Sequence, residues 1–219
     1  MDPKEVREQT IKDAKSALIL DAAHKIFSEK GYLNARLEDI AAAAGFSKPS
    51  LYSYYQDKEA IFLSLAIREM QTMAQKIEAA ASTDATFIFI LESILRIMFA
   101  NFAQTFSYFG TVTNFQALGA VQAEMSKHHE LMGRFHEIMG RGLGSMEKVI
   151  KRAREKGEIS NAQDTGGLSW FILSLIQGAH MRSWMTRKPP NVDSEVKHMI
   201  SFIMNGIAVK KTQTGKVHV

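Results

Sequence analysis

One stretch, residues 37–55 with the sequence LEDIAAAAGFSKPSLYSYY, restricts the fold of this chain more than any other. Its first apolar residues recur at helical spacing as far as Ala44, which predicts a short helix lying on a core. Gly45 follows at once, and a glycine there lets the backbone turn sharply through the left-handed region. Ser47 is a suitable N-cap for a second short helix. A helix, a glycine turn and a short polar helix together form the helix-turn-helix pattern.

The composition indicates a soluble, helical protein. Of the 219 residues, 46% are apolar and 23% are charged, and no apolar run approaches the roughly 20 residues that a transmembrane helix needs. The N-terminus lacks the apolar core of a signal peptide, so we expect a cytoplasmic location. The absence of cysteine excludes disulfides and thiolate metal sites. The net charge of +4 is too small to indicate a nucleic-acid partner by itself, so any DNA-binding surface must be a local patch.

The residues around the helix-turn-helix predict two further helices that support it. From Ser16 the apolar residues are spaced for a helix that ends at Gly31. Another helix follows the N-cap residue Asp57, and its apolar residues keep helical spacing as far as Ile77, over about six turns. Such a helix is long enough to connect a small first domain with a larger second one. Residues 1–15 alternate in charge with little apolar content, and we expect a flexible arm there.

Residues 16–68 carry a resemblance to a known family. The runs ILDAAHKIFSEKGY and LEDIAAAAGFSKPSLYSYYQDKEAIF, in this order and spacing, closely resemble the N-terminal DNA-binding domain of TetR-type transcriptional regulators. The resemblance implies a helical homodimer that binds a palindromic operator, usually as a repressor released by a small molecule. Two positions depart from the family pattern. Arg36 stands where Ser or Thr is usual, and we expect an altered helix cap and an added DNA contact. Tyr55 replaces the common Phe and should keep its buried role.

The predicted fold is all-α, with a three-helix helix-turn-helix domain joined by a connector helix to a larger helical ligand-binding and dimerisation domain. The expected boundaries are 16–68 for the DNA-binding domain, with the helix-turn-helix at about 37–56, 69–209 for the larger domain and 210–219 for a basic tail. Two strongly apolar helices, about 164–186 and 193–209, close the chain. Because one subunit cannot bury them fully, they predict a dimer interface. A change to Asp at Ile172 or Ile203 should favour dissociation if those side chains face the partner.

Four glycines interrupt the long helix that we expect over residues 127–156. They are Gly133, Gly140, Gly142 and Gly144. Glycines at such positions either permit close contact with another helix or weaken the helix for a ligand-linked shift. We expect close packing.

Most of the residues that we expect to contact DNA lie in and beside the second helix of the motif. Lysine side chains can neutralise phosphates, and serine and tyrosine hydroxyls can donate to the DNA backbone. Pro49 and Ser50 are placed to approach base edges and thymine methyl groups. Outside such a motif, each of these side chains would more often be an ordinary surface residue. The expected set is Arg36, Ser47, Lys48, Pro49, Ser50, Tyr52, Tyr54 and Lys58.

The family resemblance places a ligand pocket among the middle helices. Most of the methionines and phenylalanines there should be plain core, but some must line a cavity if the protein binds an effector. The candidates are Met98, Phe99, Phe102, Phe115, Phe135, Met139 and Trp170. Few charges interrupt these segments, which indicates a small, largely hydrophobic or aromatic effector. A polar contact to it would come from Asn101, Asn114, Gln116, His136 or Gln177.

Two other classes of function stay open at this stage, a helical enzyme with a histidine-lined cavity and an adaptor that binds partner helices. His128 and His129 suggest a metal site, but adjacent residues on a helix point about 100° apart, and no HExxH motif is present. No nucleophile elbow or glycine-rich phosphate loop is present either. We therefore expect no metal, no cofactor and no catalytic residue. Selection of a palindromic operator would separate the three hypotheses.

Overall fold

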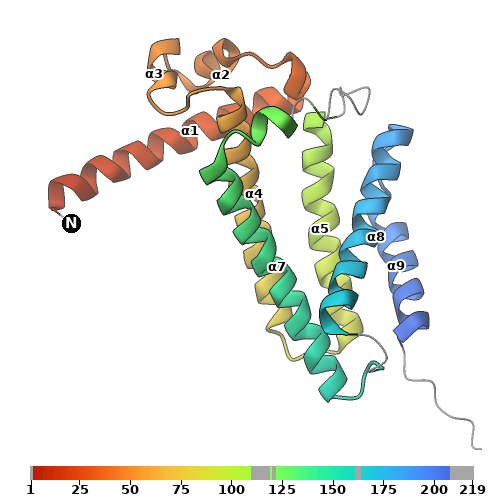
Figure 1. The fold of residues 1–219 in the computed structure, drawn as a ribbon. Helices are drawn as coiled ribbons and strands as arrows, with labels where there is room; N and C mark the ends of the chain where they lie inside the picture. The colour runs from red at the N-terminus through yellow and green to blue at the C-terminus, as the bar shows by residue number, and fades with distance from the viewer. Residues whose placement is uncertain (1, 110–118, 120–121, 161–163, 208–219) are drawn as a thin grey trace, which may run out of the picture.

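The computed structural model describes residues 2–109, 119, 122–160 and 164–207. The helices are α1 (Pro3–Asn34), α2 (Leu37–Ala44), α3 (Lys48–Tyr52), α4 (Lys58–Ala81), α5 (Phe87–Phe109), α7 (His129–Glu155), α8 (Thr165–Thr186) and α9 (Val192–Ile207). In Figure 1, α2 and α3 lie with α1 at one end of the molecule, and α4, α5, α7, α8 and α9 form a bundle below them. The expected all-α fold, with a small first unit and a larger second one, is confirmed.

The first hydrophobic core lies where α1, α2, α3 and the beginning of α4 meet. Three aromatic rings pack together in it. The ring centroids of Tyr32 and Phe62 lie 5.0 Å apart, and those of Phe27 and Phe62 lie 5.5 Å apart. Edge-on contacts of this kind add to the free energy of burial. The Tyr32 hydroxyl also donates to the Glu59 carboxylate at 2.6 Å, which fixes the start of α4 against the end of α1.

The turn between α2 and α3 has the geometry that the sequence predicts. Gly45 has φ 74° and ψ 26°, a left-handed conformation that disfavours residues with a side chain. The Ser50 N–H donates to the Ser47 hydroxyl at 3.3 Å, so Ser47 caps α3 as expected. Leu51 has no exposed surface and anchors α3 in the core. The turn, the cap and the anchor together set the position of α3 on the first core.

Residues 3–15 are helical, in contrast to the flexible arm that we expected. They continue α1 as one helix, and Figure 1 shows this part projecting away from the rest of the molecule. The Asp2 carboxylate accepts from the Lys4 N–H at 3.1 Å, and Glu5 completes a capping box. Pro3 occupies the first turn, where its missing N–H costs nothing. Local capping, rather than burial, therefore accounts for this helix, and the alternating charge was a poor guide to its conformation.

The second hydrophobic core lies among α5, α7, α8 and α9, with the last turns of α4 on one side. Ile172 is 1% exposed and Ile203 is 2% exposed, and both belong to this core. The condition of the proposed Asp substitutions, that these two side chains face a partner subunit, is therefore not met. The reason is that α8 and α9 each have two apolar faces. Ile172 and Ile203 lie on the inner faces, whereas Trp170, Phe171 and Phe202 are exposed on the outer ones.

The four glycines of α7 do not mediate close packing within the subunit. A Cβ atom added at Gly133, Gly140, Gly142 or Gly144 would meet no atom within 4 Å. The expectation of close helix contact is therefore wrong for the described part of the chain. Gly142 instead borders a cavity, where the missing side chain leaves free space.

Leu51→Ala should strongly destabilise the unit formed by α1, α2, α3 and the start of α4, because Leu51 is fully buried in the first core. A Leu to Ala change at such a site costs about 2–5 kcal/mol of unfolding free energy. Thermal unfolding followed by circular dichroism measures the loss. Tyr52→Ala, at the neighbouring exposed position of α3, is the matched control and should leave the transition nearly unchanged. Equal transition temperatures for the two variants would contradict this packing.

Candidate functional site

The short helix α3 exposes most of the residues that the sequence assigned to DNA contact. Leu51 holds the helix to the core, whereas Lys48, Pro49 and Tyr52 are exposed. Ser47 is also exposed, and Ser50 and Tyr54 are half-buried. Figure 1 shows α3 at the end of the molecule away from the bundle, where the bundle helices do not obstruct it. A short exposed helix of this kind fits the major groove of DNA, which is about 12 Å wide.

Lys48 is paired with a carboxylate of the preceding helix. Its Nζ atom lies 2.5 Å from Oε1 of Glu38, and both side chains are exposed. The hydrogen bond between them lowers the pKa of Glu38 and raises the pKa of Lys48. Exposed ion pairs contribute little free energy and are screened by salt. Lys48 can therefore exchange Glu38 for another anion at low cost.

Arg36 occupies the N-cap position of α2. Its backbone N–H donates to the Asp39 carboxylate at 3.4 Å, and its own side chain is exposed and makes no capping hydrogen bond. Asp39 also pairs with Lys30 at 2.9 Å, and this hydrogen bond lowers the pKa of the Asp39 carboxyl group. The altered cap that we expected from Arg36 is thus present. A DNA contact by its guanidinium stays a prediction.

Lys58, which we also expected to contact DNA, is engaged within the protein. Its ammonium donates to the backbone carbonyls of Tyr32 at 3.0 Å and Ala35 at 3.2 Å, and it lies 4.6 Å from the centre of the Tyr32 ring. Burial lowers the pKa of the Lys58 ammonium. Lys58 therefore ties the start of α4 to the end of α1, and a phosphate contact would require it to leave these carbonyls.

The two tyrosines that follow α3 help to hold the helix-turn-helix together. The Tyr54 ring packs edge-on against Phe46, with ring centroids 5.9 Å apart. Tyr55 is 9% exposed, and its hydroxyl lies 2.6 Å from the hydroxyl of Ser16. Burial raises the pKa of the Tyr55 hydroxyl. The buried role that we expected for Tyr55 is confirmed, and its hydroxyl adds a polar link to α1.

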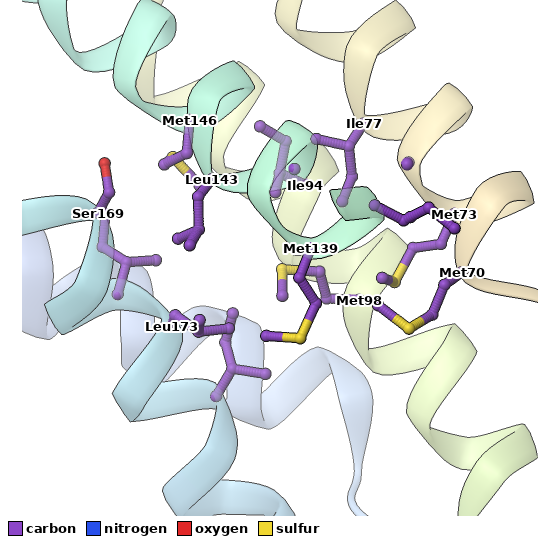
Figure 2. Close-up of a pocket in the computed structure, with 15 residues that line it drawn as sticks. Met70, Met73, Ile77, Ile94, Met98, Met139, Leu143, Met146, Ser169 and Leu173 are labelled. Atoms are coloured by element: carbon purple, nitrogen blue, oxygen red, sulfur yellow. The ribbon is translucent and has the colours of Figure 1, made fainter. Parts of the chain in front are cut away.

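A cavity of about 150 Å³ lies between α4, α5, α7 and α8. Figure 2 shows methionine side chains from three of these helices around it, namely Met70 and Met73 from α4, Met98 from α5, and Met139 and Met146 from α7. Among the described residues, Ser169 supplies the single polar side chain of the wall, and its hydroxyl donates to a backbone carbonyl one turn earlier. The lining residues are Met70, Met73, Ala74, Ile77, Ile94, Met98, Ile138, Met139, Gly142, Leu143, Met146, Ser169, Ile172, Leu173 and Ile176.

The sequence identified only part of this wall. Met98 and Met139 line the cavity, as expected for a ligand site. Met70, Met73 and Ile77 of α4 were missed as lining residues, because their helical stripe was interpreted as the packing face of a connector. Their position on the connector could nevertheless have identified them. A long helix that leaves the first core must border any cavity that the second domain encloses.

The aromatic residues assigned to the cavity do not line it. Phe99 is fully buried in the second core. Trp170 is 54% exposed on the outer face of α8. Phe135 packs in a small cluster with α4, beside the cavity rather than in its wall. These three assignments are therefore wrong for this cavity, because helical spacing alone does not tell which face of an all-round apolar helix is enclosed. The side chain of Phe102 and the whole of Phe115 lie outside the described residues.

A more polar groove of about 620 Å³ lies between α4 and α5. Its lining residues are Arg68, Glu69, Thr72, Met73, Lys76, Arg96, Ile97, Ala100 and Asn101. Met73 therefore belongs to the walls of both the groove and the cavity. Of the polar residues that we expected near a ligand, Asn101 lines the groove, and His136 and Gln177 are exposed elsewhere. The other two, Asn114 and Gln116, lie outside the described residues.

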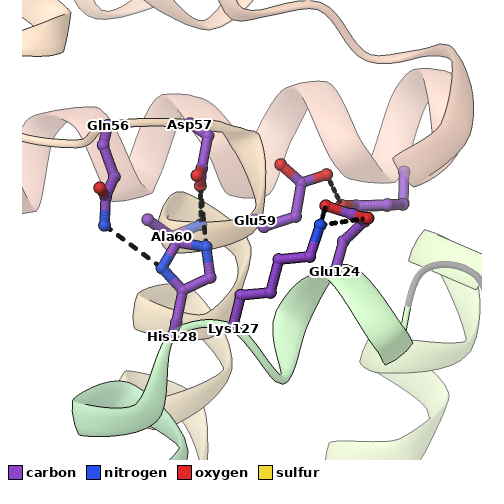
Figure 3. Close-up of polar contacts among 8 residues, drawn as sticks. Gln56, Asp57, Glu59, Ala60, Glu124, Lys127 and His128 are labelled. Carbon is purple, nitrogen blue, oxygen red and sulfur yellow. Dashed lines mark hydrogen bonds and ion pairs between the residues drawn. The ribbon is translucent and has the colours of Figure 1, made fainter.

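The first unit and the bundle meet at polar contacts around the start of α4 (Figure 3). The Asp57 carboxylate caps α4 by accepting from the Ala60 N–H at 2.7 Å. The same carboxylate lies 3.2 Å from Nε2 of His128, at the start of α7, and the Gln56 amide lies 3.4 Å from the other ring nitrogen. One carboxylate therefore both begins the connector helix and joins it to the bundle.

The described residues hold no cluster of three or more His, Cys, Asp or Glu side chains that could bind a metal ion. The described lining residues of the cavity and the groove include no histidine. His180 lies next to Phe99, with ring centroids 5.5 Å apart, and burial lowers the pKa of its imidazole to about 4. Within the same described residues, no helix is long and apolar enough to cross a membrane.

Two family models match the chain. The model of bacterial regulatory proteins of the tetR family matches residues 19–65, which contain the helix-turn-helix. The model of the tetracyclin repressor-like C-terminal domain matches residues 117–199. The two matches follow one another in the order of the two structural units.

Individual proteins agree with these matches. The chain is 26% identical to the transcriptional repressor ComR of Escherichia coli over 169 residues, which span 73% of this chain and 74% of ComR. Its fold is similar to a TetR-family regulator of Mesorhizobium loti, with a TM-score of 0.69, 18% identity and coverage of 90% of this chain and 98% of the other. It is also similar to FadR of Bacillus subtilis, solved with stearoyl-CoA, with a TM-score of 0.66, 20% identity and coverage of 87% and 98%. The chain therefore belongs to the TetR family of helix-turn-helix transcriptional regulators.

Proposed function

We propose that this regulator is a repressor that binds a palindromic operator as a homodimer and leaves it when a small, largely apolar molecule occupies the cavity. The observation that carries the proposal is the course of α4. Its N-cap residue Asp57 closely follows the exposed helix α3, and its second half supplies Met70, Met73, Ala74 and Ile77 to the cavity wall. One rigid element thus joins the two sites, so a change at one is transmitted to the other.

The proposed dimer rests on the outer faces of α8 and α9. Large apolar side chains are exposed there, and the rings of Phe171 and Phe202 stack across the two helices with centroids 6.2 Å apart. Contiguous exposed apolar surface of this kind marks an interface with a partner. The exposed set is Trp170, Phe171, Met181, Met185 and Phe202. Pairing of these faces between two copies would present two α3 helices, which must lie about 34 Å apart to enter successive major grooves.

The size of the cavity supports release by a ligand. Its volume of about 150 Å³ is smaller than the roughly 300–1,000 Å³ of ordinary ligand pockets. An effector must therefore enlarge it, and methionine side chains, which are flexible, form much of its wall. Enlargement also displaces the cavity-lining half of α4. A displacement at this end changes the separation of the two recognition helices, which weakens both operator contacts at once.

The chemistry of the cavity favours a binding role over the alternatives. Its single polar side chain, Ser169, is already hydrogen-bonded to the backbone, and no titratable group lines the wall among the described residues. General acid or base catalysis requires such a group. An enzyme is therefore disfavoured. The stearoyl-CoA bound to the FadR neighbour supports an effector with an aliphatic part.

Phe202→Asp should convert the dimer to a monomer at micromolar concentration, because the exposed Phe202 ring would be buried by the partner and a carboxylate there would be buried without a counter-charge. Light scattering in moderate salt measures the change. Val6→Asp is the control, since Val6 is comparably exposed but lies on α1, far from α8 and α9 (Figure 1). A dimer that persists in Phe202→Asp, or a monomeric unchanged protein, would exclude this interface.

Lys48→Ala should weaken operator binding and reduce the slope of log affinity against log salt by about one unit, as expected for one lost phosphate contact. Glu38→Gln should have the opposite effect, because it releases Lys48 from its ion pair and removes a negative charge near α3. Lys151→Ala, an exposed lysine on α7, serves as the control. Fluorescence anisotropy with a selected operator at several salt concentrations tests both changes. Identical salt slopes for Lys48→Ala and the unchanged protein would show that Lys48 does not contact phosphate.

Operator DNA should weaken the binding of a dodecyl-chain ligand by the same factor by which that ligand weakens operator binding, because coupling free energies are reciprocal. A coupling of roughly 1–3 kcal/mol corresponds to about 5- to 150-fold. Calorimetric titration with and without operator measures the factor. Gly142→Leu places a side chain in the cavity from α7 and should weaken ligand binding while leaving operator affinity intact. Equal ligand affinities in the two titrations would mean that the cavity is unconnected to DNA binding.

A further inference from the structure

The groove between α4 and α5 has a chemistry that the proposed apolar effector does not use. Arg68, Lys76 and Arg96 line it, and Glu69 is the one acidic residue among its described lining residues. Thr72 and Asn101 add uncharged polar groups. The groove is thus a cationic and polar surface that adjoins an apolar cavity, and Met73 is shared by the two walls.

We propose that the effector is an amphiphile, with an unbranched aliphatic chain in the cavity and a carboxylate or phosphate head group in the groove. This inference rests on the proposed ligand-released function and names the chemical class of the ligand. The chain reaches the cavity past Met73, whose flexible thioether can change rotamer to open the passage.

The cavity wall selects an aliphatic chain rather than an aromatic ring system. The described wall contains no aromatic side chain for a ring to stack on, and it is built from Met, Ile, Leu, Ala and Gly with one serine. Its volume of about 150 Å³ also suits a thin chain better than a fused ring. A chain can extend as methionines move aside one at a time, whereas a rigid ring would require the helices to separate before it enters.

The groove supplies cations for the head group. Lys76 is exposed and forms no ion pair with the described residues. The Arg96 guanidinium is shared between Glu92 at 2.9 Å and Asp193 at 2.5 Å, and all three side chains are exposed. Arg68 lies 2.7 Å from Asp21, again with both side chains partly exposed. Solvent-exposed pairs are weak, so an anionic head group can replace these carboxylates, and charge-assisted hydrogen bonds favour it over an uncharged head.

The groove also borders the contact between α4 and the DNA-binding unit. Arg68 pairs with Asp21 of α1, and its neighbour Glu69 lies 4.0 Å from Nε2 of His24, one turn further along α1. Both residues of α4 line the groove. A head group that takes Arg68 from Asp21 therefore loosens α4 from α1 at the same time as the chain displaces the cavity-lining half of α4. The two parts of one ligand act on the same helix.

Three probes with the same chain test the head-group site: dodecanoate, dodecyl phosphate and dodecanol, each below its micellar concentration. Calorimetry with the full chain should show the two anionic probes binding at least about tenfold more tightly than dodecanol, the expected effect of charge-assisted hydrogen bonds. The ratio of dodecanoate to dodecyl phosphate affinity then tells which head group the site prefers. Equal or tighter binding of dodecanol would overturn the proposal.

Variants separate the groove from the cavity. Lys76→Gln should remove most of the anionic advantage and leave dodecanol binding unchanged, whereas Lys148→Gln, an exposed lysine of α7 outside the groove, should change neither. Gly142→Leu should weaken all three probes, and Gly133→Leu, on the same helix but away from the cavity, should weaken none. A Lys76→Gln protein that binds all three probes as the unchanged protein does would overturn the groove assignment.

The connection to DNA is tested with Asp21→Asn. This substitution removes the negative charge that pairs with Arg68 and leaves the shape of the side chain at position 21 nearly unchanged. This variant should bind operator more weakly without any probe, and dodecanoate should then weaken operator binding by a smaller factor. Asp13→Asn, on the exposed part of α1, controls for the change in net charge. Unchanged values of both quantities in Asp21→Asn would overturn the competition for Arg68.

The results that would contradict the anionic head-group site differ from those that would contradict ligand-released repression. If dodecanol releases the operator as well as dodecanoate does, release by an apolar ligand stands and the anionic head-group site falls. If the anionic probes bind tightly and selectively but the operator affinity does not change, the binding site stands and ligand-released repression falls.

Discussion

The rest of the structure depends on α4 being buried in two cores at once. Ile61 and Leu65 have no exposed surface in the first core, and Ile77 is 3% exposed in the second. A helix of 24 residues is about 36 Å long at 1.5 Å per residue, so it spans both units without a break. Because packed cores resist continuous deformation, neither end of this helix can move freely relative to its own core. The proposed movement at the cavity would therefore change the orientation of the DNA-binding unit.

The contact between His128 and Asp57 strengthens this connection at the end near the DNA-binding unit. Asp57 caps α4, and a cap of this type contributes about 0.5–2 kcal/mol to helix stability. The same carboxylate faces His128 at the start of α7 (Figure 3). A rotation of α7 that withdraws His128 therefore also perturbs the first turn of α4, which begins six residues after α3 ends. Two of the helices that line the cavity, α4 and α7, thus meet at this contact between the bundle and the DNA-binding unit.

The sequence predicted the local structure of the DNA-binding unit well, because each decisive feature there is a short-range one. Gly45 allows a left-handed backbone, Ser47 caps the next turn, and Leu51 is the one aliphatic residue of a five-residue helix apart from Pro49. The start of α1 was also a local feature, but the Asp2 capping box was overlooked in favour of the alternating charge. The residues that line the cavity could not be predicted from short-range features of this kind. Trp170 and Ile172 lie on one helix, two residues apart, and only tertiary packing decides that Trp170 is outside and Ile172 inside.

The distribution of ion pairs supports the proposed control of DNA binding by a small movement of α4. Lys30, Lys48 and Arg68 all pair with carboxylates of the DNA-binding unit, at 2.9, 2.5 and 2.7 Å. The charges of these three side chains are therefore partly neutralised in the protein without DNA. This limits the sequence-independent attraction to phosphates, which dominates non-specific binding. In the proposed dimer, affinity then depends more on the fit of two recognition helices to two half-sites at a fixed spacing. If the affinity for DNA rests on this spacing, rotation of a single connecting helix weakens binding. A protein that binds DNA mainly through unpaired positive charges would be less sensitive to such a rotation.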